Sequence, residues 1–303
     1  MSAVPGALRR AWDQPLWLLW VAPLIWATNI TLGRAVAASF PPVSLTLLRW
    51  LIAGAVLAPF IWPRVVAQWP LLRRHWLLIC ASGAFGMAGY SALAYIALHS
   101  TTAASVAFIN STLPLMVPIV MLFIGREAIA PQALAGICVS FCGVLWIMSH
   151  GDPARLAHLS FAGGELLTLA AVAMYAVYSV LVRRKPRELD LLVFLFGCIV
   201  AGVAVLLPFT AFELAGGARI PTDARSIATV LYIGVVISLF GYLMWNHTVV
   251  ALGPGISGAS YHLLSVFTPL VAYLWLGEKL AGYHYAGIAL ILAGVFIAAR
   301  PKR

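Results

Sequence analysis

The chain has 303 residues, of which 63% are hydrophobic and only 9% are charged. Soluble domains carry about 25% charged residues, so the composition excludes an ordinary soluble protein and predicts an integral membrane protein. The net charge of +10 does not indicate nucleic-acid binding, because the basic residues lie in short loops between apolar segments, where they set orientation in a bilayer.

Ten segments are long and apolar enough to span a bilayer, which takes about 20 residues in a helix. In chain order they cover residues 15–33, 42–62, 76–98, 103–124, 132–149, 164–183, 191–213, 226–248, 257–276 and 282–299. Proline, glycine and charged residues separate them, and no loop is long enough for a soluble domain. We therefore expect an all-α integral membrane protein with ten transmembrane helices.

The first segment could instead be read as a signal peptide, because Arg9 and Arg10 precede it and Ala35-Val36-Ala37 resembles a cleavage site. The apolar core of a signal peptide has roughly 7–15 residues, and the segment 15–33 is longer. We expect a first membrane helix that stays attached to the chain.

The second half of the sequence repeats the first half. Seven residues recur 151 positions later: Pro118, Glu127, Ala135, Gly136, Ile137, Gly143 and Val144 return as Pro269, Glu278, Ala286, Gly287, Ile288, Gly294 and Val295. A duplicated unit in a very apolar chain is typical of secondary transporters, whose substrate path lies between the two halves. We expect an N-terminal repeat over residues 1–151 and a C-terminal repeat over 152–303, with five helices each.

The distribution of lysine and arginine predicts the orientation. Even-numbered loops and the two tails hold 13 of the 19 basic residues, odd-numbered loops hold five, and Arg49 lies within a span. The cytoplasmic side carries the excess, so both termini are expected there, in a bacterial inner membrane. Because each repeat has an odd number of helices, the second starts from the opposite side, which makes an inverted pair. Arg126-Glu127 would then face the cytoplasm and Glu278-Lys279 would face outward.

Several stretches resemble the drug/metabolite transporter superfamily, specifically its ten-helix branch with two EamA-type repeats. They are Trp26-Ala27-Thr28-Asn29, residues 48–54, and residues 118–144 with their repeat at 269–295. Members of this branch export amino acids and other metabolites, and the layout is similar to that of the aromatic amino acid exporters within it. The resemblance implies a secondary transporter that exports small metabolites, with aromatic or other large neutral amino acids as the expected substrates.

Polar side chains at membrane depth cost free energy and therefore mark candidate functional residues. Helical stripes in both halves carry aromatic, hydroxyl and amide groups that would line a central cavity, although aromatic residues in such stripes often serve packing. The candidate substrate-binding residues are Trp26, Asn29, Tyr90, Tyr175, Tyr178, Trp245, Asn246 and Tyr261.

Arg49 is the one charged residue well inside a span. It lies seven residues past Pro42, which is about 10 Å along a helix. It could neutralise a substrate carboxylate, or it could tie helix ends together through backbone carbonyl groups. The structural role is favoured, because the corresponding region of the second half, around Cys198, has no charge.

The nine acidic residues all lie at span ends or in loops. A carboxylate at mid-membrane is the usual proton relay or cation site, so a drug pump for organic cations is disfavoured. His247 and His262 are the deep groups that titrate near neutrality, and each could couple transport to protons or serve a structural role. In the fourth span, Asn110 shares a helix face with Pro114 and Pro118, which free carbonyl groups and permit a kink.

Other classes of protein fit less well. Gly255-Ile256-Ser257-Gly258 resembles the serine motif of rhomboid proteases, but His262 and His284 are poorly placed to act as its base. A channel would be expected to carry a ring of like charges. A nucleotide-sugar carrier would need several basic residues in its cavity, and a drug carrier is a further alternative. We expect no enzyme activity, cofactor or metal site, and the chain could act as a monomer with a small-molecule substrate.

Overall fold

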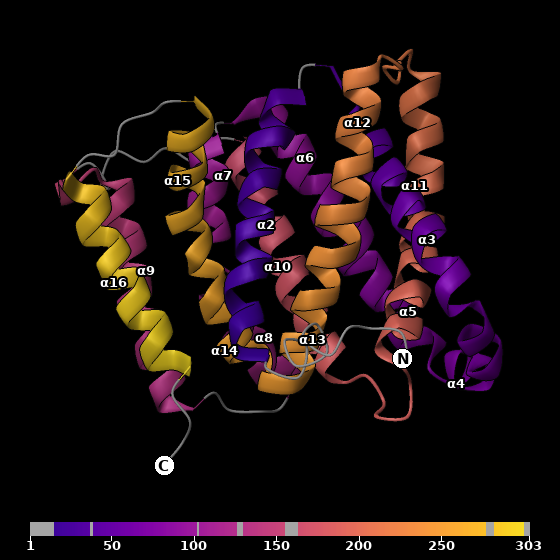
Figure 1. Ribbon diagram of the computed structural model, residues 1–303, viewed down its shortest axis with the longest axis horizontal. Helices are drawn as coiled ribbons and strands as arrows, with labels where there is room; N and C mark the ends of the chain where they lie inside the picture. The colour runs from indigo at the N-terminus through magenta and orange to yellow at the C-terminus, as the bar shows by residue number, and fades with distance from the viewer. Residues whose placement is uncertain are drawn as a thin grey trace.

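The computed structural model describes residues 15–36, 39–101, 103–125, 130–154, 163–276 and 282–299. Within these ranges the chain forms a bundle of helices without any β-strand (Figure 1). Arg126-Glu127 and Glu278-Lys279, whose sidedness the sequence predicts, lie outside the described residues.

Six described helices are long and apolar enough to cross a membrane: Pro42–Ala67, Trp76–Ser100, Pro131–Met148, Gly163–Arg183, Leu191–Ala215 and Ala224–Leu252. Shorter apolar helices cover Pro15–Ile30, Phe108–Ile124 and Gly282–Ala298. Large apolar side chains such as Phe60, Phe123 and Phe212 are exposed, as expected where a bundle faces lipid.

The described residues of the first half form five helical stretches. They are α2 (Pro15–Val36), α3 (Pro42–Ala67) with the short α4 (Trp69–Arg74), the continuous stretch α5 (Trp76–Ser82), η1 (Gly83–Tyr90) and α6 (Ser91–Ser100), the stretch α7 (Ala103–Asn110), α8 (Leu113–Val120) and η2 (Met121–Gly125), and α9 (Pro131–Met148).

The second half follows the same order. Its stretches are α10 (Gly163–Arg183), α11 (Leu191–Ala215), the continuous α12 (Ala224–Tyr232), η4 (Ile233–Gly241) and α13 (Tyr242–Leu252), the stretch α14 (Pro254–Ser260), η5 (Tyr261–Leu263) and α15 (Leu264–Leu276), and α16 (Gly282–Ala299).

Helix starts follow local sequence signals. Pro42 and Pro131 occupy the first turn of α3 and α9, where a residue without an N–H loses no helical hydrogen bond. Asp190 caps α11, because its Oδ1 accepts a hydrogen bond of 2.8 Å from the backbone N–H of Leu192. The side chain of Asp223 caps α12 in the same way through Ser226.

Glycines bring α9 and α16 into close contact at one edge of the bundle (Figure 1). A Cβ placed on Gly136 would lie 2.5 Å from the carbonyl oxygen of Gly294, and one on Gly143 would lie 2.7 Å from that of Gly287. Low numbers on α9 therefore pair with high numbers on α16, so the two helices are antiparallel. Gly136 thus faces Gly294, which is the repeat counterpart of Gly143, and Gly143 faces Gly287, which is the repeat counterpart of Gly136.

The α3–α11 pair is held in a similarly reciprocal way. The end of α3 contacts the start of α11, where Arg64 pairs with Asp190 at 3.5 Å. The end of α11 contacts the start of α3, where Glu213 accepts hydrogen bonds from the backbone N–H and the hydroxyl of Ser44, at 2.7 and 2.6 Å. These two helices are also antiparallel.

In each half, the third helical stretch carries a π-helical segment in its middle: η1 in the stretch from α5 to α6 and η4 in the stretch from α12 to α13. At the start of η1, Gly83 abuts the backbone of α11 at Cys198, and in η4 Gly234 abuts the backbone of α3 at Arg49. A side chain at either glycine would overlap the neighbouring helix. π-Helical turns often occur at functional sites, and each of these two packs against helices of the other half.

The two halves interlock rather than stand apart. In the first half, η1 and α6 pack against α10 and α11, and in the second half η4 and α13 pack against α2 and α3. One large cluster of buried apolar residues runs through both halves. Any cavity at its centre is therefore built by both halves.

The fourth stretch is interrupted between α7 and α8, close to Pro114. α7 ends at Asn110 and α8 begins at Leu113. At this interruption the backbone N–H of Leu115 bonds to the carbonyl of Thr112. The carbonyl of Ser111 lies 2.8 Å from Nε2 of His262 of η5.

Candidate functional site

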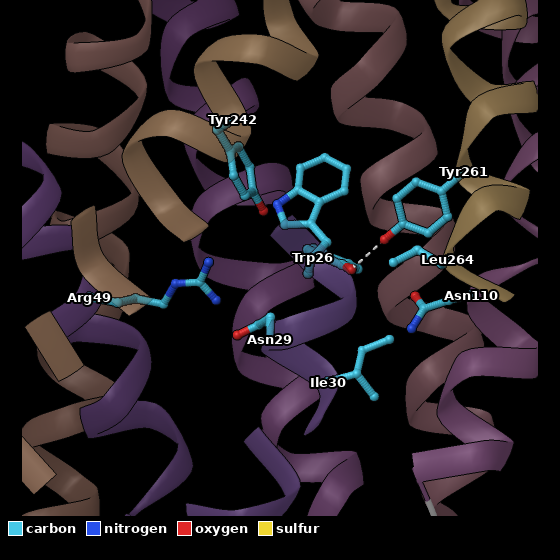
Figure 2. Close-up of a pocket in the computed structure, with 9 residues that line it drawn as sticks. Trp26, Asn29, Ile30, Arg49, Asn110, Tyr242, Tyr261 and Leu264 are labelled. Carbon is cyan, nitrogen blue, oxygen red and sulfur yellow. Dashed lines mark hydrogen bonds between the residues drawn. The ribbon is translucent and has the colours of Figure 1, made fainter. Parts of the chain in front are cut away.

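A small enclosed pocket lies at the centre of the bundle, between the two halves. Its lining combines polar and aromatic side chains from both: Trp26, Asn29, Ile30, Arg49, Tyr90, Asn110, Tyr242, Tyr261 and Leu264 (Figure 2). Water-sized molecules have about 20 Å³ of space in it, enough for about one water. The pocket as it stands is closed to an organic solute, which needs more space.

Two of the polar side chains that line the pocket lie near helix ends on one side of the bundle. Asn29 comes seven residues before the end of α2, and Arg49 comes seven residues after the start of α3, about 10 Å along each helix. Both approach the pocket from the same side of the bundle. This is the side on which α6 ends and α7 begins.

An aromatic cluster closes the pocket toward the opposite side. It includes Trp26, whose ring centroid lies 5.4 Å from that of Trp245, 5.6 Å from that of Tyr261 and 5.8 Å from that of Tyr175. We use the name aromatic cluster for these four residues together with Tyr90, Tyr178 and Tyr242, which complete it through further ring contacts. Aromatic pairs packed edge-on or tilted stabilise a fold by about 0.5–1.5 kcal/mol per pair, beyond the contribution of their buried area.

Hydroxyl groups within the aromatic cluster pair with polar partners. The hydroxyls of Tyr90 and Tyr261 lie 2.7 Å apart, which joins η1 of the first half to η5 of the second. Tyr178 donates a hydrogen bond of 2.7 Å to Oδ1 of Asn246. These bonds fix the rings, so the closed state is held by specific contacts as well as by apolar packing.

Arg49 is 3% exposed and reaches the pocket from α3. Its Nε donates to the hydroxyl of Ser238 at 2.6 Å, and Nη1 donates to the hydroxyl of Tyr95 at 3.0 Å. Tyr95 in turn donates to Oδ1 of Asn29 at 2.8 Å. The guanidinium carbon of Arg49 also lies 5.3 Å from the ring centroid of Trp50, in the range of a cation–π contact.

Several buried polar atoms around the centre have no hydrogen-bond partner among the described residues. They are Oδ1 of Asn110, the hydroxyl of Tyr175, Nε1 of Trp245 and Nδ2 of Asn246. Buried polar groups are nearly always paired, and leaving one unpaired costs about 1–3 kcal/mol. Such a concentration of unpaired groups is typical of a place where water or a ligand binds.

Half of the candidate substrate-binding residues line this pocket, namely Trp26, Asn29, Tyr90 and Tyr261. The other four lie behind it: Tyr175, Tyr178, Trp245 and Asn246 are fully buried in or beside the aromatic cluster. The structure adds Asn110 and Tyr242 to the lining. Both carry polar groups inside apolar spans, and the same feature identified the candidate substrate-binding residues in the sequence.

The two deep histidines are outside the pocket lining. His262 is fully buried, with Nε2 on the carbonyl of Ser111 and Nδ1 in contact with the hydroxyl of Ser140. It therefore joins η5 to α9 and to the interruption after α7. His247 lies on α13, next to Asn246, and is partly buried.

Comparison with known proteins identifies the family. The model of the EamA-like transporter family matches twice, over residues 15–149 and 162–300, and the chain belongs to this family. It is therefore a multi-pass membrane protein built from two copies of the family domain.

The chain is similar over nearly its whole length to several curated transporters. It is 24% identical to an uncharacterized transporter of Bacillus subtilis, YetK, over 93% of this chain and 86% of the relative. A probable terminal-alkyne amino-acid exporter of Streptantibioticus cattleyicolor is 26% identical, with 94% and 93% covered. A probable amino-acid metabolite efflux pump of Salmonella typhimurium is 27% identical, with 90% and 91% covered.

A solved crystal structure shares the fold. It superposes with a TM-score of 0.70 at 23% identity, over 95% of this chain and 96% of the other. The arrangement of helices described above thus occurs in an experimentally determined structure.

Proposed function

We propose that this member of the EamA-like transporter family exports aromatic or other large neutral amino acids by alternating access through the central pocket. The observation that carries the proposal is the pocket itself, which lies between the halves, has an aromatic wall and presents amide and hydroxyl groups. Aromatic rings stack on flat apolar side chains, while the polar groups suit an ammonium and a carboxylate. Two relatives named for amino-acid export support the same substrate class.

The proposed architecture is ten transmembrane helices in two inverted repeats, residues 1–151 and 152–303. It is supported by the reciprocal contacts of α9 with α16 and of α3 with α11, each between antiparallel helices. Equivalent helices that meet antiparallel are expected when a pseudo-two-fold axis lies in the membrane plane. Both termini would lie in the cytoplasm of a bacterial cell, with the protein in the inner membrane.

In this proposal, opening of the aromatic cluster is the transport step. The closed pocket has no room for an amino acid, so Trp26 and its neighbours must separate to admit one. Two π-helical segments contribute to the site, because Tyr90 ends η1 and Ser238 of η4 accepts a hydrogen bond from Arg49. π-Helical turns often occur at functional sites. The substrate would then contact Trp26, Asn29, Tyr90 and Tyr261 directly, and the remaining candidates once the cluster has opened.

A nucleotide-sugar carrier is less well supported. A diphosphate would need several cationic groups, and Arg49 is the one basic residue in the lining. A protease is not supported either. The hydroxyl of Ser257 is buried on α14 and has no hydrogen-bond partner among the described residues, whereas a serine nucleophile needs a base within hydrogen-bond reach.

Substrate counterflow in proteoliposomes tests the proposal. Vesicles that contain the purified protein and are loaded with unlabelled L-phenylalanine are expected to take up labelled L-phenylalanine transiently. Overexpression should also protect cells from toxic phenylalanine or tryptophan analogues, and Asn29→Ala or Trp245→Ala should weaken that protection at equal expression. Unchanged sensitivity, together with no counterflow of any neutral amino acid, would refute it.

A further inference from the structure

Among the residues that the structure describes, no carboxylate pairs with the charge of Arg49. A guanidinium stays protonated at any accessible pH, and a charged group at membrane depth is costly unless an opposite charge pairs with it. Among the described residues, the ion pair that forms is between Arg64 and Asp190. Arg49 donates hydrogen bonds to two neutral hydroxyl groups, those of Ser238 and Tyr95.

The structural explanation of Arg49 does not match these contacts. An arginine that ties helix ends together would donate to backbone carbonyl groups, whereas Arg49 donates to Ser238 and Tyr95 side chains. Both hydroxyls direct their own protons elsewhere, Ser238 to the carbonyl of Ile233 at 2.8 Å and Tyr95 to Asn29 at 2.8 Å. They therefore hold the guanidinium by their lone pairs and leave its positive charge in place.

The guanidinium is aimed at the pocket. Figure 2 shows Arg49 extending from α3 toward Asn29, with Asn110 beyond it on the far side. Asn110 is 3% exposed, and its Oδ1 has no partner among the described residues. The pocket thus presents a fixed cation from one wall and an unused hydrogen-bond acceptor from another.

We propose that Arg49 is the residue that recognises the carboxylate of the transported amino acid. Arginine pairs with a carboxylate through two parallel N–H···O bonds, which provide both strength and orientation. The unpaired oxygen of Asn110 suits the ammonium group, so the two poles of a zwitterion have separate partners. This inference rests on the proposed amino acid transport, and it adds the requirement that the substrate carry a free carboxylate.

Competition with a matched ligand series tests the inference on the unmodified protein. L-phenylalanine, L-phenylalaninamide and phenethylamine share the phenyl ring and the amine, but only the first has a carboxylate. In wild-type proteoliposomes, the amide and the amine are expected to compete against labelled L-phenylalanine at least about tenfold more weakly than the free acid, because they lose the charge-assisted pair. Equal competition by the amide would overturn the role of Arg49 and leave amino acid transport standing.

Variants then assign the preference to the residue. Arg49→Gln should bring the acid and the amide to within about twofold of each other, whereas Arg49→Lys, which keeps a point charge, should retain part of the preference. Arg73→Gln is the matched control, since Arg73 is exposed on α4, and it should behave as wild type. A folded Arg49→Gln protein that keeps the wild-type preference would refute the proposal.

The design separates this inference from the proposed function. Should wild type show no counterflow of any neutral amino acid, the proposed function fails and the inference with it. If Arg49→Gln lowers thermal stability but leaves the acid-to-amide ratio unchanged, the residue is structural. If Arg49→Gln does not fold, the ligand series on wild type decides alone.

Discussion

Gly143 on α9 and Gly287 on α16 meet backbone to backbone, because a Cβ on either residue would lie within 2.9 Å of the other's carbonyl oxygen. Gly287 is the repeat counterpart of Gly136, and Gly136 in turn faces Gly294. The two helices therefore use the same surface toward each other, as in an isologous interface. Small residues let membrane helices approach closely and associate through dispersion forces.

We expect Gly287→Ala to destabilise the protein by about 1–3 kcal/mol, as overpacking of a close interface does. Gly282→Ala, on the same helix, provides the control, because a Cβ there meets nothing within 4 Å. The measurement is the thermal unfolding midpoint of each purified variant in detergent. Equal midpoints for the two variants would show that the α9–α16 contact does not stabilise the fold.

The cap that Glu213 places on α3 is a second stabilising contact between the halves. Its carboxylate accepts from the backbone N–H of Val43 and from both the N–H and the hydroxyl of Ser44. The substitution Glu213→Ala removes this carboxylate and leaves N–H donors at the start of α3 unpaired. We expect it to lower the free energy of unfolding by about 1–2 kcal/mol. Glu188→Ala, at an exposed position, should leave the unfolding midpoint unchanged. A loss of equal size in both variants would argue against the cap.

The proposed topology can be tested at described loops. Glu188 lies between α10 and α11, and Arg219 lies between α11 and α12. One membrane helix separates these exposed residues, so Glu188→Cys should react with an impermeant thiol reagent from the cytoplasm and Arg219→Cys from outside. The unmodified protein controls for its own four cysteines. Labelling of both positions from one side would contradict the topology.

Transport is expected to run down the substrate gradient, with weak proton dependence at most. The described acidic residues near the spans are at helix ends, as Glu165 and Glu213 are, so no described carboxylate is placed at mid-membrane to relay protons. The remaining deep titratable groups are His247 and His262. We expect no strong uphill accumulation under an imposed pH gradient in the double variant His247→Gln, His262→Gln. Strong uphill accumulation in that variant would contradict this expectation.

The positions of the helices could be predicted from the sequence because hydropathy is a local property. The predicted segment 191–213 corresponds to α11, Leu191–Ala215, and the predicted segment 282–299 corresponds to α16, Gly282–Ala299. The duplication was visible for the same reason, since each repeat carries its own glycines and prolines. The depth of Arg49 followed from counting residues along a helix.

The partners of each side chain were decided only by the tertiary structure. Helical periodicity placed Tyr90, Tyr178 and Trp245 on candidate stripes, but Tyr90 lines the pocket while the other two are packed behind it. A stripe specifies a helix face and leaves open which helix faces it. In addition, the π-helical turns in η1 and η4 change the register of every later residue relative to an α-helical stripe. Whether Asn110 or Tyr242 reaches the pocket therefore depends on how the two halves interlock, which no single helix determines.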